Sequence, residues 1–584
     1  MPTLVLACGA SWAWAQDGDL PSKPLIGLVG RDAGLVMEAT RLSDRLPEAT
    51  RSPILGRLRE LELYRRWLAS DDYQKLVQTR NQLESLLDTA SLSQFVDDVF
   101  GESVVVAVYP AGGSEPAGIL LTQARSPDVL ARTLSAWNAA ERADLETLRH
   151  SGREYVRRTV PSPPRDSSDD SKTQYYAAIG RTFALSDNEP AVKRALELAA
   201  STDLSDSLAE ESRYRTARQS LADETLATAW VNPQVWEAAA GETGPGDASS
   251  ALRAVGLSRG VESVIVGLRL EDGVLVEAVV HLEAAASRDA WSEFVEQAAG
   301  PAELLGRAPR NALLVLAGRT DLTRTERLLS AQLPEQNRRQ WEMIKQLSPL
   351  LAIDLVNDVL PVLGENWALC LVPRDDPQPH APLDAVFAFD LAAGPDVAGR
   401  RPGQERLDRG LATAWERLAR ILAQADTQPD VAVQTETAGS TVIRWVAGLG
   451  PYAPTCAVSD EALVLASSPA AARAWLEVPA GGRLAADAAY GGWHRRYLAG
   501  RNPALFVNVA ALRDSFSTHR HVLARRAADE GRLSAEAAAE RLDRFDDLLK
   551  LVDAAFATVE LGERHVRIVV GSVVASEDPP HVRP

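Results

Sequence analysis

The second half of the chain repeats the first half, and this repeat constrains the fold more than any other feature. Four pairs match at the same offset of 276 positions: Leu208 with Leu484, Tyr214 with Tyr490, Val231 with Val507, and Asn232 with Asn508. Four matches in one register are not expected by chance. Most shared positions hold apolar, aromatic, glycine or proline residues, which build cores and turns. The repeat therefore predicts architecture and leaves the chemistry open.

The register extends along most of the chain and shifts only where loops can differ in length. Trp137 matches Trp415 at an offset of 278, and the Gly-Glu pair at 101–102 matches the pair at 364–365 at 263. The second copy therefore gains 15 residues before Trp415. We expect these residues in the loop-like, Pro- and Gly-rich segments, Arg374 to Pro382 and Gly394 to Gln404, because duplicated domains tolerate insertions in loops.

These matches predict two tandem modules, at residues 24–298 and 299–584. Residues 1–15 are expected to be a signal peptide and residues 16–23 a polar linker. Each module is somewhat larger than the commonest domain size but within the range of a single domain.

Each module is expected to contain strands and helices in the same order. Apolar runs predict strands at Leu35 to Ala39, Val104 to Tyr109 and Ala117 to Thr122, with counterparts in the second copy. The longest helix is predicted over Leu61 to Leu87, and further helices carry Trp137 and Trp415. A hairpin is predicted to close each module, the first being Val264 to Leu282. Strands joined by hairpins with helices packed on them indicate an α+β fold with mainly antiparallel sheet.

Composition indicates a folded chain with two cores. Hydrophobic residues make up 46% of the 584 residues and charged residues 24%, close to globular averages. The 62 basic and 80 acidic side chains give a net charge of −18, which opposes binding to nucleic acid or to an anionic membrane surface. We therefore expect no nucleic-acid partner.

The N-terminus predicts export. Leu4 to Ala15 is an apolar stretch that is too short to span a bilayer, and it ends in Ala13-Trp14-Ala15, which fits a signal-peptidase site. No Lys or Arg precedes Lys23, so either the true start lies upstream or the stretch is an ordinary buried terminus. Cys8 leaves open a lipoprotein-type alternative. No other apolar run approaches membrane-spanning length, so we expect no membrane span.

Cleavage would leave two cysteines, Cys370 and Cys456, both in strand-like apolar stretches. An oxidising compartment would permit a disulfide between them. We favour two buried thiols because their counterparts in the first copy are not cysteines.

Three segments carry a family resemblance: "FGESVVVAVYP", "FALSDNEPAVKRAL" and "LVLASSPAAARAWL". Together with the export signal and the two copies, they resemble a family of uncharacterised exported bacterial proteins grouped under a domain of unknown function. The resemblance implies localisation and fold, and it carries no activity that could be transferred to particular residues.

One catalytic pattern occurs, Gly256-Leu257-Ser258-Arg259-Gly260, which matches the G-x-S-x-G nucleophile elbow. That elbow requires a strand that leads into a helix. Here the order is reversed, because residues 249–255 are predicted as helix and Val261 to Leu270 as strand. The nearby downstream acid and histidine, Asp272 and His281, lie in the adjoining hairpin. We therefore expect a turn rather than a nucleophile.

Other residue groups are weaker still. His519 and His521 fall on a predicted helix, Leu512 to Arg526, where their spacing does not place them on one face, so we expect solvated side chains and no metal site. No glycine-rich phosphate loop is present. Adjacent carboxylates occur at Asp97-Asp98, Asp169-Asp170, Asp375-Asp376 and Asp546-Asp547, and are expected to be solvated. Trp137, Trp230, Trp415 and Trp475 lie on apolar faces and are expected in the core.

The sequence therefore predicts an exported, non-enzymatic binding or structural protein, with an unknown protein or small ligand as partner. It indicates no catalytic residue, cofactor or metal. The alternative is a hydrolase that acts on an envelope or extracellular polymer, with carboxylates from loops unique to one copy. A cluster of acids with shifted pKa values in a pocket would favour the enzyme. An exposed apolar patch without such a cluster would favour the binding protein.

Overall fold

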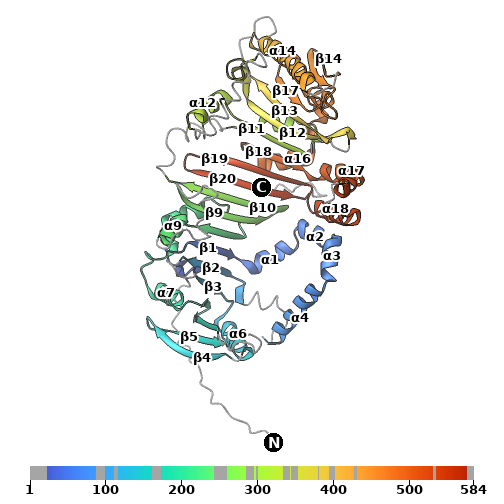
Figure 1. Cartoon of the computed structure of the whole chain (residues 1–584). Coiled ribbons are helices and arrows are strands. Elements are labelled where there is room, and N and C mark those ends of the chain that lie inside the picture. Colours follow the sequence, from blue (N-terminus) through green and yellow to red (C-terminus); the bar gives the residue numbers. More distant parts are fainter. Residues whose placement is uncertain are drawn as a thin grey trace. The chain divides into compact units, whose positions relative to one another are not determined.

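The computed structural model describes most of the chain between residues 23 and 574 (Figure 1). The described ranges are 23–86, 99–110, 116–141, 143–160, 172–241, 260–283, 295–296, 300–332, 342, 353–378, 381–392, 402–425, 430–529 and 534–574. The chain forms two compact units. Unit 1 comprises residues 1–46, 75–220 and 226–256, and unit 2 comprises residues 47–74, 221–225 and 257–584.

Unit 1 is built on an antiparallel sheet with the strand order β8-β1-β2-β3-β7-β6-β5-β4. The strands are β1 (Leu35–Thr40), β2 (Ser103–Tyr109), β3 (Ala117–Gln123), β4 (Asp144–His150), β5 (Arg153–Val160), β6 (Lys172–Ile179), β7 (Thr182–Ser186) and β8 (Ala227–Val231). The predicted strands at Leu35, Val104 and Ala117 are therefore confirmed.

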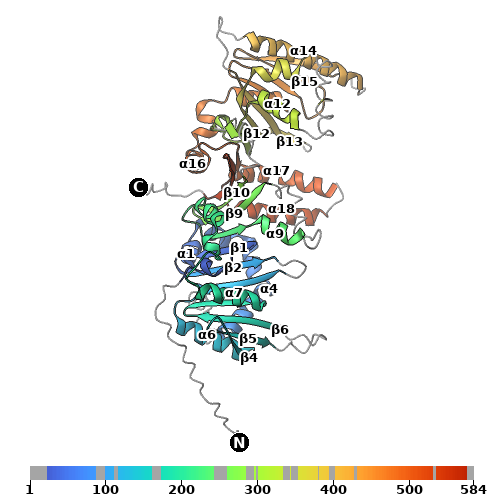
Figure 2. The same ribbon diagram turned by 90° about the vertical axis from the view of Figure 1, so that its left-hand side faces the viewer.

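Helices cover this sheet, and their starts follow from the sequence. The helical elements are η1 (Leu25–Leu28), α6 (Pro127–Ala140), α7 (Glu189–Ala200), η2 (Leu208–Glu210), α8 (Ser212–Gln219) and α9 (Pro233–Gly241). Asn188 caps α7 by accepting a hydrogen bond from the Ala191 N–H, and Pro190 occupies the first turn. α7 packs over β3, β6 and β7, burying Val192 and Leu196 (Figure 2).

The prediction of one long helix over Leu61 to Leu87 is wrong in one respect, because two helices, α3 and α4, occupy this segment. The structure has α1 (Leu42–Thr50), α2 (Pro53–Glu60), α3 (Glu62–Leu68) and α4 (Asp71–Leu86). The Ser70 hydroxyl accepts a hydrogen bond from the Tyr73 N–H at 3.3 Å. Ser70 therefore begins a new helix, and the acidic residues after it suit a first turn.

Unit 2 contains an antiparallel sheet with the strand order β9-β10-β20-β19-β18-β11-β12-β13-β17-β16-β15-β14. The strands are β9 (Val261–Leu270), β10 (Gly273–Leu282), β11 (Leu314–Arg319), β12 (Leu363–Gln378), β13 (Ala381–Leu391), β14 (Ala432–Ala438), β15 (Thr441–Ala447), β16 (Thr455–Val458), β17 (Ala462–Ala466), β18 (Ala504–Asn508), β19 (Ala554–Leu561) and β20 (His565–Val573). From β18 to β14, this order follows the order from β8 to β4 in unit 1.

The helical elements of unit 2 pack around this sheet. They are η3 (Glu303–Arg307), α12 (Leu322–Gln332), η4 (Leu355–Val359), η5 (Leu360–Val362), α14 (Pro402–Ala425), α15 (Pro469–Leu476), η6 (Ala480–Gly482), η7 (Leu484–Ala486), α16 (Ala488–Trp493), η8 (His494–Leu498), α17 (Val509–Asp529) and α18 (Ala535–Leu549). α14 packs over β14, β15 and β16, and α15 packs over β13 and β17. The mixed fold with antiparallel sheet is therefore confirmed.

One expected loop is instead part of a hairpin. The segment from Arg374 onward extends β12, which ends at Gln378, and β13 begins at Ala381. Arg374 stabilises this extension because its guanidinium donates two hydrogen bonds to Asp384 Oδ1, at 3.1 and 2.9 Å.

The residues matched between the two halves make corresponding backbone contacts. The Leu208 N–H donates to the Val29 carbonyl, and the Leu484 N–H donates to the Ala308 carbonyl, both at 2.8 Å. The Asn232 and Asn508 N–H groups donate to the carbonyls of Gly34 and Leu313, both at 2.9 Å.

Candidate functional site

The hairpin of β9 and β10 carries charged residues among apolar neighbours in the sheet of unit 2. Glu277 lies in the middle of β10 and is 3% exposed. Its register partners are Gly267 on β9 and Val569 on β20. Because a buried carboxylate without partners is strongly destabilising, the surroundings of Glu277 must supply positive charge.

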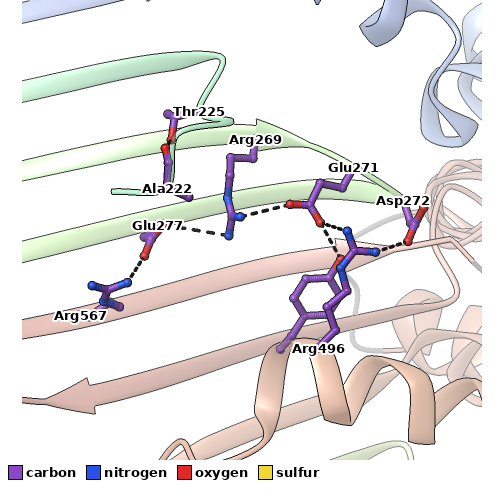
Figure 3. Close-up of polar contacts among 9 residues, drawn as sticks. Ala222, Thr225, Arg269, Glu271, Asp272, Glu277, Arg496 and Arg567 are labelled. Atoms are coloured by element: carbon purple, nitrogen blue, oxygen red, sulfur yellow. Dashed lines mark hydrogen bonds and ion pairs between the residues drawn. The ribbon is translucent and has the colours of Figure 1, made fainter. Parts of the chain in front are cut away.

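Two arginines from the neighbouring strands supply that charge (Figure 3). Arg567 on β20 donates to Glu277 Oε1 at 2.7 Å, and Arg269 on β9 lies 4.0 Å from Glu277 Oε2. The missing side chain of Gly267 leaves room for Leu221 and Thr225, which lie about 3 Å from the place a Cβ would take. The segment 221–225 therefore helps to cover this face of the hairpin.

The same network continues to the turn of the hairpin. Arg269 donates to Glu271 Oε1 at 3.1 Å, and Glu271 Oε2 accepts from Arg496 at 2.5 Å and from the Tyr497 hydroxyl at 3.0 Å. Arg496 also donates to Asp272 Oδ2 at 2.7 Å. Figure 3 shows these residues meeting between the hairpin turn and η8.

This ion-pair network fastens the hairpin to η8 and to the core. The Tyr497 ring stacks on Phe556 at 4.9 Å, so its hydroxyl connects the network to the apolar core. Burial and the negative charge of Glu271 raise the pKa of Tyr497, which therefore stays a donor. Each acid in the network is matched by an arginine. The arrangement therefore supplies rigidity rather than a carboxylate poised for proton transfer.

The opposite face of the same strands is apolar. Residues paired across antiparallel strands lie side by side on one face. Three successive rows cross the sheet, and we call them the apolar face: Leu505, Ala557, Val570, Val276 and Leu268; Val559, Ile568, Ala278 and Val266; and Leu561, Val566, Val280 and Val264.

Side chains on the apolar face reach solvent. Val276 and Val570, which are register partners, are 37% and 49% exposed. The row that begins with Val507 and Ala555 lies beside the row of Leu505 and Ala557. α17 and α18 cover the sheet there, because Phe516 and Leu549 pack with Val507 and Ala555. Helices therefore already pack on one end of this face (Figure 1).

The sequence itself carries a pattern that indicates the charged network. Arg269 and Glu277 interrupt apolar runs at positions facing the same side of the hairpin, which marks them as inward-facing charges. The arginines that pair with Glu271 and Glu277 are Arg496 and Arg567, each more than 200 residues away in sequence, so the network could not be assembled from spacing alone.

The structure describes only some of the residues considered for a serine nucleophile. Ser258 and the turn around it lie outside the described residues, so its expected inert role stays a prediction. Asp272 and His281 lie just before and near the end of β10, nine residues apart, which corresponds to about 30 Å in an extended strand. At that separation Asp272 cannot hydrogen-bond to His281, as the acid of a catalytic triad must. The expected strand Val261 to Leu270 is confirmed.

His519 differs from the expectation of a solvated side chain. It lies on α17, is 9% exposed, and its Nδ1 is 2.6 Å from the Ser515 carbonyl. His521 is exposed. Within the described ranges, no group of three or more His, Cys, Asp or Glu side chains is arranged to hold a metal ion.

The structure describes the side chains of only one of the four adjacent carboxylate pairs. Asp97-Asp98 and Asp169-Asp170 lie outside the described residues, as do the side chains of Asp375-Asp376. Asp546 and Asp547 both pair with Lys550, at 3.0 and 2.9 Å, and Asp547 also accepts from the Leu63 N–H. This pair therefore anchors α3 to the end of α18.

The two cysteines and the four tryptophans expected in the core are buried or pack against core residues. Cys370 and Cys456 are free and buried, and burial raises the pKa of each thiol to about 12. Trp230 and Trp475 are buried, and Trp137 and Trp415 pack against core clusters. The Arg158 guanidinium lies 3.7 Å from the centre of the Trp137 ring.

Glu38 on β1 of unit 1 is a partly exposed acid that the sequence did not single out. The Tyr214 hydroxyl donates to Glu38 Oε2 at 3.2 Å. Burial raises the pKa of Glu38, against the opposing effect of Arg218. In unit 2, the buried hydroxyl of Tyr490 has no hydrogen-bond partner among the described residues. The two matched tyrosines therefore differ in their surroundings.

Comparisons with known proteins place the chain without assigning a reaction. A model of the family described as "Protein of unknown function (DUF3352)" matches residues 101–445, more than half of the chain. No curated protein matches it. Crystal structures of TP0453 in crystal forms I and IV match with 9% identity and a TM-score of 0.23, over 45% and 44% of this chain and 81% and 79% of TP0453. A TM-score this low carries no conclusion.

Proposed function

The chain belongs to the DUF3352 family of proteins of unknown function, and from this premise we propose that it is an exported binding protein that receives its partner on the apolar face of unit 2. Family membership agrees with the resemblance expected from the sequence. The observation that supports this function is the solvent exposure of Val276 and Val570 in the middle of an apolar sheet surface. Exposed apolar surface of this kind marks interaction sites.

The partner that suits this surface best is an amphipathic helix of another protein. α17 and α18 already pack their apolar sides on the adjoining row of the sheet. α2 lies at the same end, where Arg57 donates to Asp553 Oδ2 at 2.7 Å. A partner helix would continue this helical layer across β20, β10 and β9. Helix on sheet is a standard way to bury an apolar sheet face.

The charged network supports this role from the other side of the sheet. Recognition surfaces bind best when the elements that carry them are held in place before the partner arrives. Glu277 and Glu271 hold β9, β10 and β20 to one another and to η8 through arginines. The apolar face is thereby presented by strands whose positions are already determined.

Photo-crosslinking in native cells tests the function. A photoreactive phenylalanine analogue at position 276 or 570 should form a discrete protein adduct, and the crosslinked partner peptide should show apolar residues at helical spacing. The matched control is the same analogue at Leu145, which is 48% exposed but lies on an edge strand of unit 1. A synthetic copy of the identified peptide should bind the protein, and Val276→Glu should weaken that binding at least about tenfold, because a charge would be buried.

Several outcomes would contradict the proposal. They are adducts only with lipid, adducts only with a second copy of this chain, no adduct at either position, or equal peptide binding by the Val276→Glu variant.

We also propose that the two modules predicted by the repeat, residues 24–298 and 299–584, derive from a tandem duplication. The shared strand order and the corresponding hydrogen bonds of Leu208 and Leu484 support this origin. An experimental structure should superpose Tyr214 on Tyr490 and Asn232 on Asn508. Placement of these pairs on unrelated elements would contradict it.

A further inference from the structure

Two histidines lie opposite each other where the hairpin of β9 and β10 joins the rest of the sheet of unit 2. His281, near the end of β10, and His565, at the start of β20, are register partners. Directly opposed residues on antiparallel strands have Cβ atoms about 4.5–5.5 Å apart, so their side chains interact. β20 connects this hairpin to β19 and, through β19, to the remaining strands. The histidine pair therefore lies at the junction of β10 and β20.

Both histidines are partly buried at this junction. Ser263 on β9 is the other register partner of His281 and is 1% exposed. The His565 ring lies over Gly562, with Cε1, Nδ1 and Nε2 within 2.9 Å of the place a Cβ would take. Because Gly562 has no side chain, the His565 ring packs beside the end of β19 instead of extending into solvent.

The charged side chains around the pair are already matched with one another. Arg564 pairs with Glu262, which lies at the bulge of β9, at 3.4 Å. Arg567 donates to Glu277 at 2.7 Å and lies 3.7 Å from Glu560 on β19. Each arginine therefore has an acidic partner while the histidines are neutral. A positive charge added to the histidines would compete with the arginines for these acids.

The folded state resists protonation of His281. Burial lowers the pKa of His281 and the nearby His565 lowers it further; Arg564 and Arg567 act in the same direction, whereas Glu262 opposes them. The unfolded chain therefore binds this proton more readily than the folded chain does. The stability that depends on neutral His281 is complete above the unfolded-state pKa of about 6.5, and it is lost as pH falls through the lowered pKa.

We propose that His281 and His565 form an acid-sensitive pair that loosens the junction of β10 and β20 when both are protonated. Two imidazolium ions then lie opposite each other, and like charges directly opposite across antiparallel strands are destabilising.

The same two strands carry Val276 and Val570, which are register partners on the apolar face. Acid should therefore weaken binding of a partner at that face, a consequence that rests on the proposed function. The acid sensitivity of the junction itself does not depend on that function.

Hydrogen exchange of the full chain at pH 7.5 and 5.0, followed by mass spectrometry, tests the histidine pair. Protection factors correct for the intrinsic pH dependence of exchange and report how easily each segment opens. In the wild type, protection at residues 278–282 and 565–569 should fall about 2- to 5-fold more than protection of β11, as expected for repulsion between opposed like charges.

Matched variants separate the pair from general effects of acid. His281→Gln and His565→Gln should each reduce the additional loss, because only one positive charge can form, and the double variant should abolish it. The control is His494→Gln. His494 is also partly buried and its pKa is also lowered, by burial and by Arg495, but it lies on η8 rather than opposite another histidine. This variant should keep the wild-type loss at the junction.

The proposal is overturned if the wild-type junction loses no more protection than β11 at pH 5.0, or if the double variant responds as the wild type does. If the double variant does not fold, an unchanged response in either single variant overturns it. These measurements involve no partner. Their failure would leave the photo-crosslinking test of the function intact, and a failure of photo-crosslinking would leave the acid-sensitive pair intact.

Discussion

At the scale of single residues, charges placed inside strands distinguish this protein from a simple apolar sheet. Glu277 is almost completely buried, yet arginines on both neighbouring strands approach its carboxylate. Glu38 in unit 1 is only partly buried, a tyrosine donates to it, and its pKa is raised. Arginines pair with the first carboxylate, whereas burial raises the pKa of the second and favours its protonated form.

Replacing Glu277 is expected to destabilise unit 2. Glu277→Gln removes the buried anion of Arg567 and leaves only the half-exposed Glu560 near its guanidinium. Breaking a buried ion pair in this way costs about 3–5 kcal/mol. Urea denaturation measures the change in the free energy of unfolding. The control is Glu560→Gln, because Glu560 is half exposed and lies 3.7 Å from Arg567; its effect should stay within about 1 kcal/mol. Equal effects of the two substitutions would show that the network does not depend on Glu277.

Glu38 should make the stability of the protein depend on pH. Because the folded-state pKa of Glu38 is raised, the folded state holds this proton more tightly than the unfolded chain does. The resulting stabilisation is complete below the unfolded-state pKa of about 4.3 and is lost as pH rises through the raised pKa. Glu38→Gln keeps an acceptor for Tyr214 without the charge. The stability of the Glu38→Gln variant relative to wild type should therefore increase with pH.

Urea denaturation of wild type and Glu38→Gln across pH 4–8 checks this sign. Glu210→Gln is the control, because Glu210 is about half exposed and should follow the wild-type profile. Parallel pH profiles for wild type and Glu38→Gln would mean that Glu38 does not titrate differently on folding.

At the scale of elements, the starts of helices could be predicted from the sequence, because a capping side chain acts on residues close to it in the chain. Asn188 and Ser468 each accept a hydrogen bond from the N–H three residues later, at 3.2 Å, and a proline follows in the first turn. The same local chemistry explains the break at Ser70, where a serine and two acids outweighed the apolar pattern that predicted one long helix.

The cap of α7 is expected to contribute to stability by itself. Asn188→Ala removes the acceptor for the Ala191 N–H and should cost about 1 kcal/mol. Asn188→Asp retains a capping oxygen and should stay close to wild type. Chemical denaturation followed by circular dichroism distinguishes the two variants. Equal losses in both would assign the effect to packing rather than to the cap.

At the scale of the whole molecule, the proposed export would determine which partners the apolar face can meet. The Leu4 to Ala15 core and the Ala13-Trp14-Ala15 site predict that the mature chain begins near Gln16. Mass spectrometry of the protein from its native cells measures this end directly. An intact peptide from Met1 through Lys23 in the soluble cytoplasmic fraction would contradict export, and it would move the search for a partner to the cytoplasm.

The sequence by itself determined the antiparallel α+β character, many strand positions and the family resemblance, because apolar alternation and capping are local patterns. It also predicted the paired halves. Only the tertiary structure decided which charges meet: Glu277 needs Arg567, and Glu271 needs Arg496, each more than 200 positions away. It also decided that the hairpin of β9 and β10 adds to the sheet of unit 2 beside β20. Sequence spacing cannot reveal such contacts, because strand pairing over long separations depends on how the whole sheet assembles.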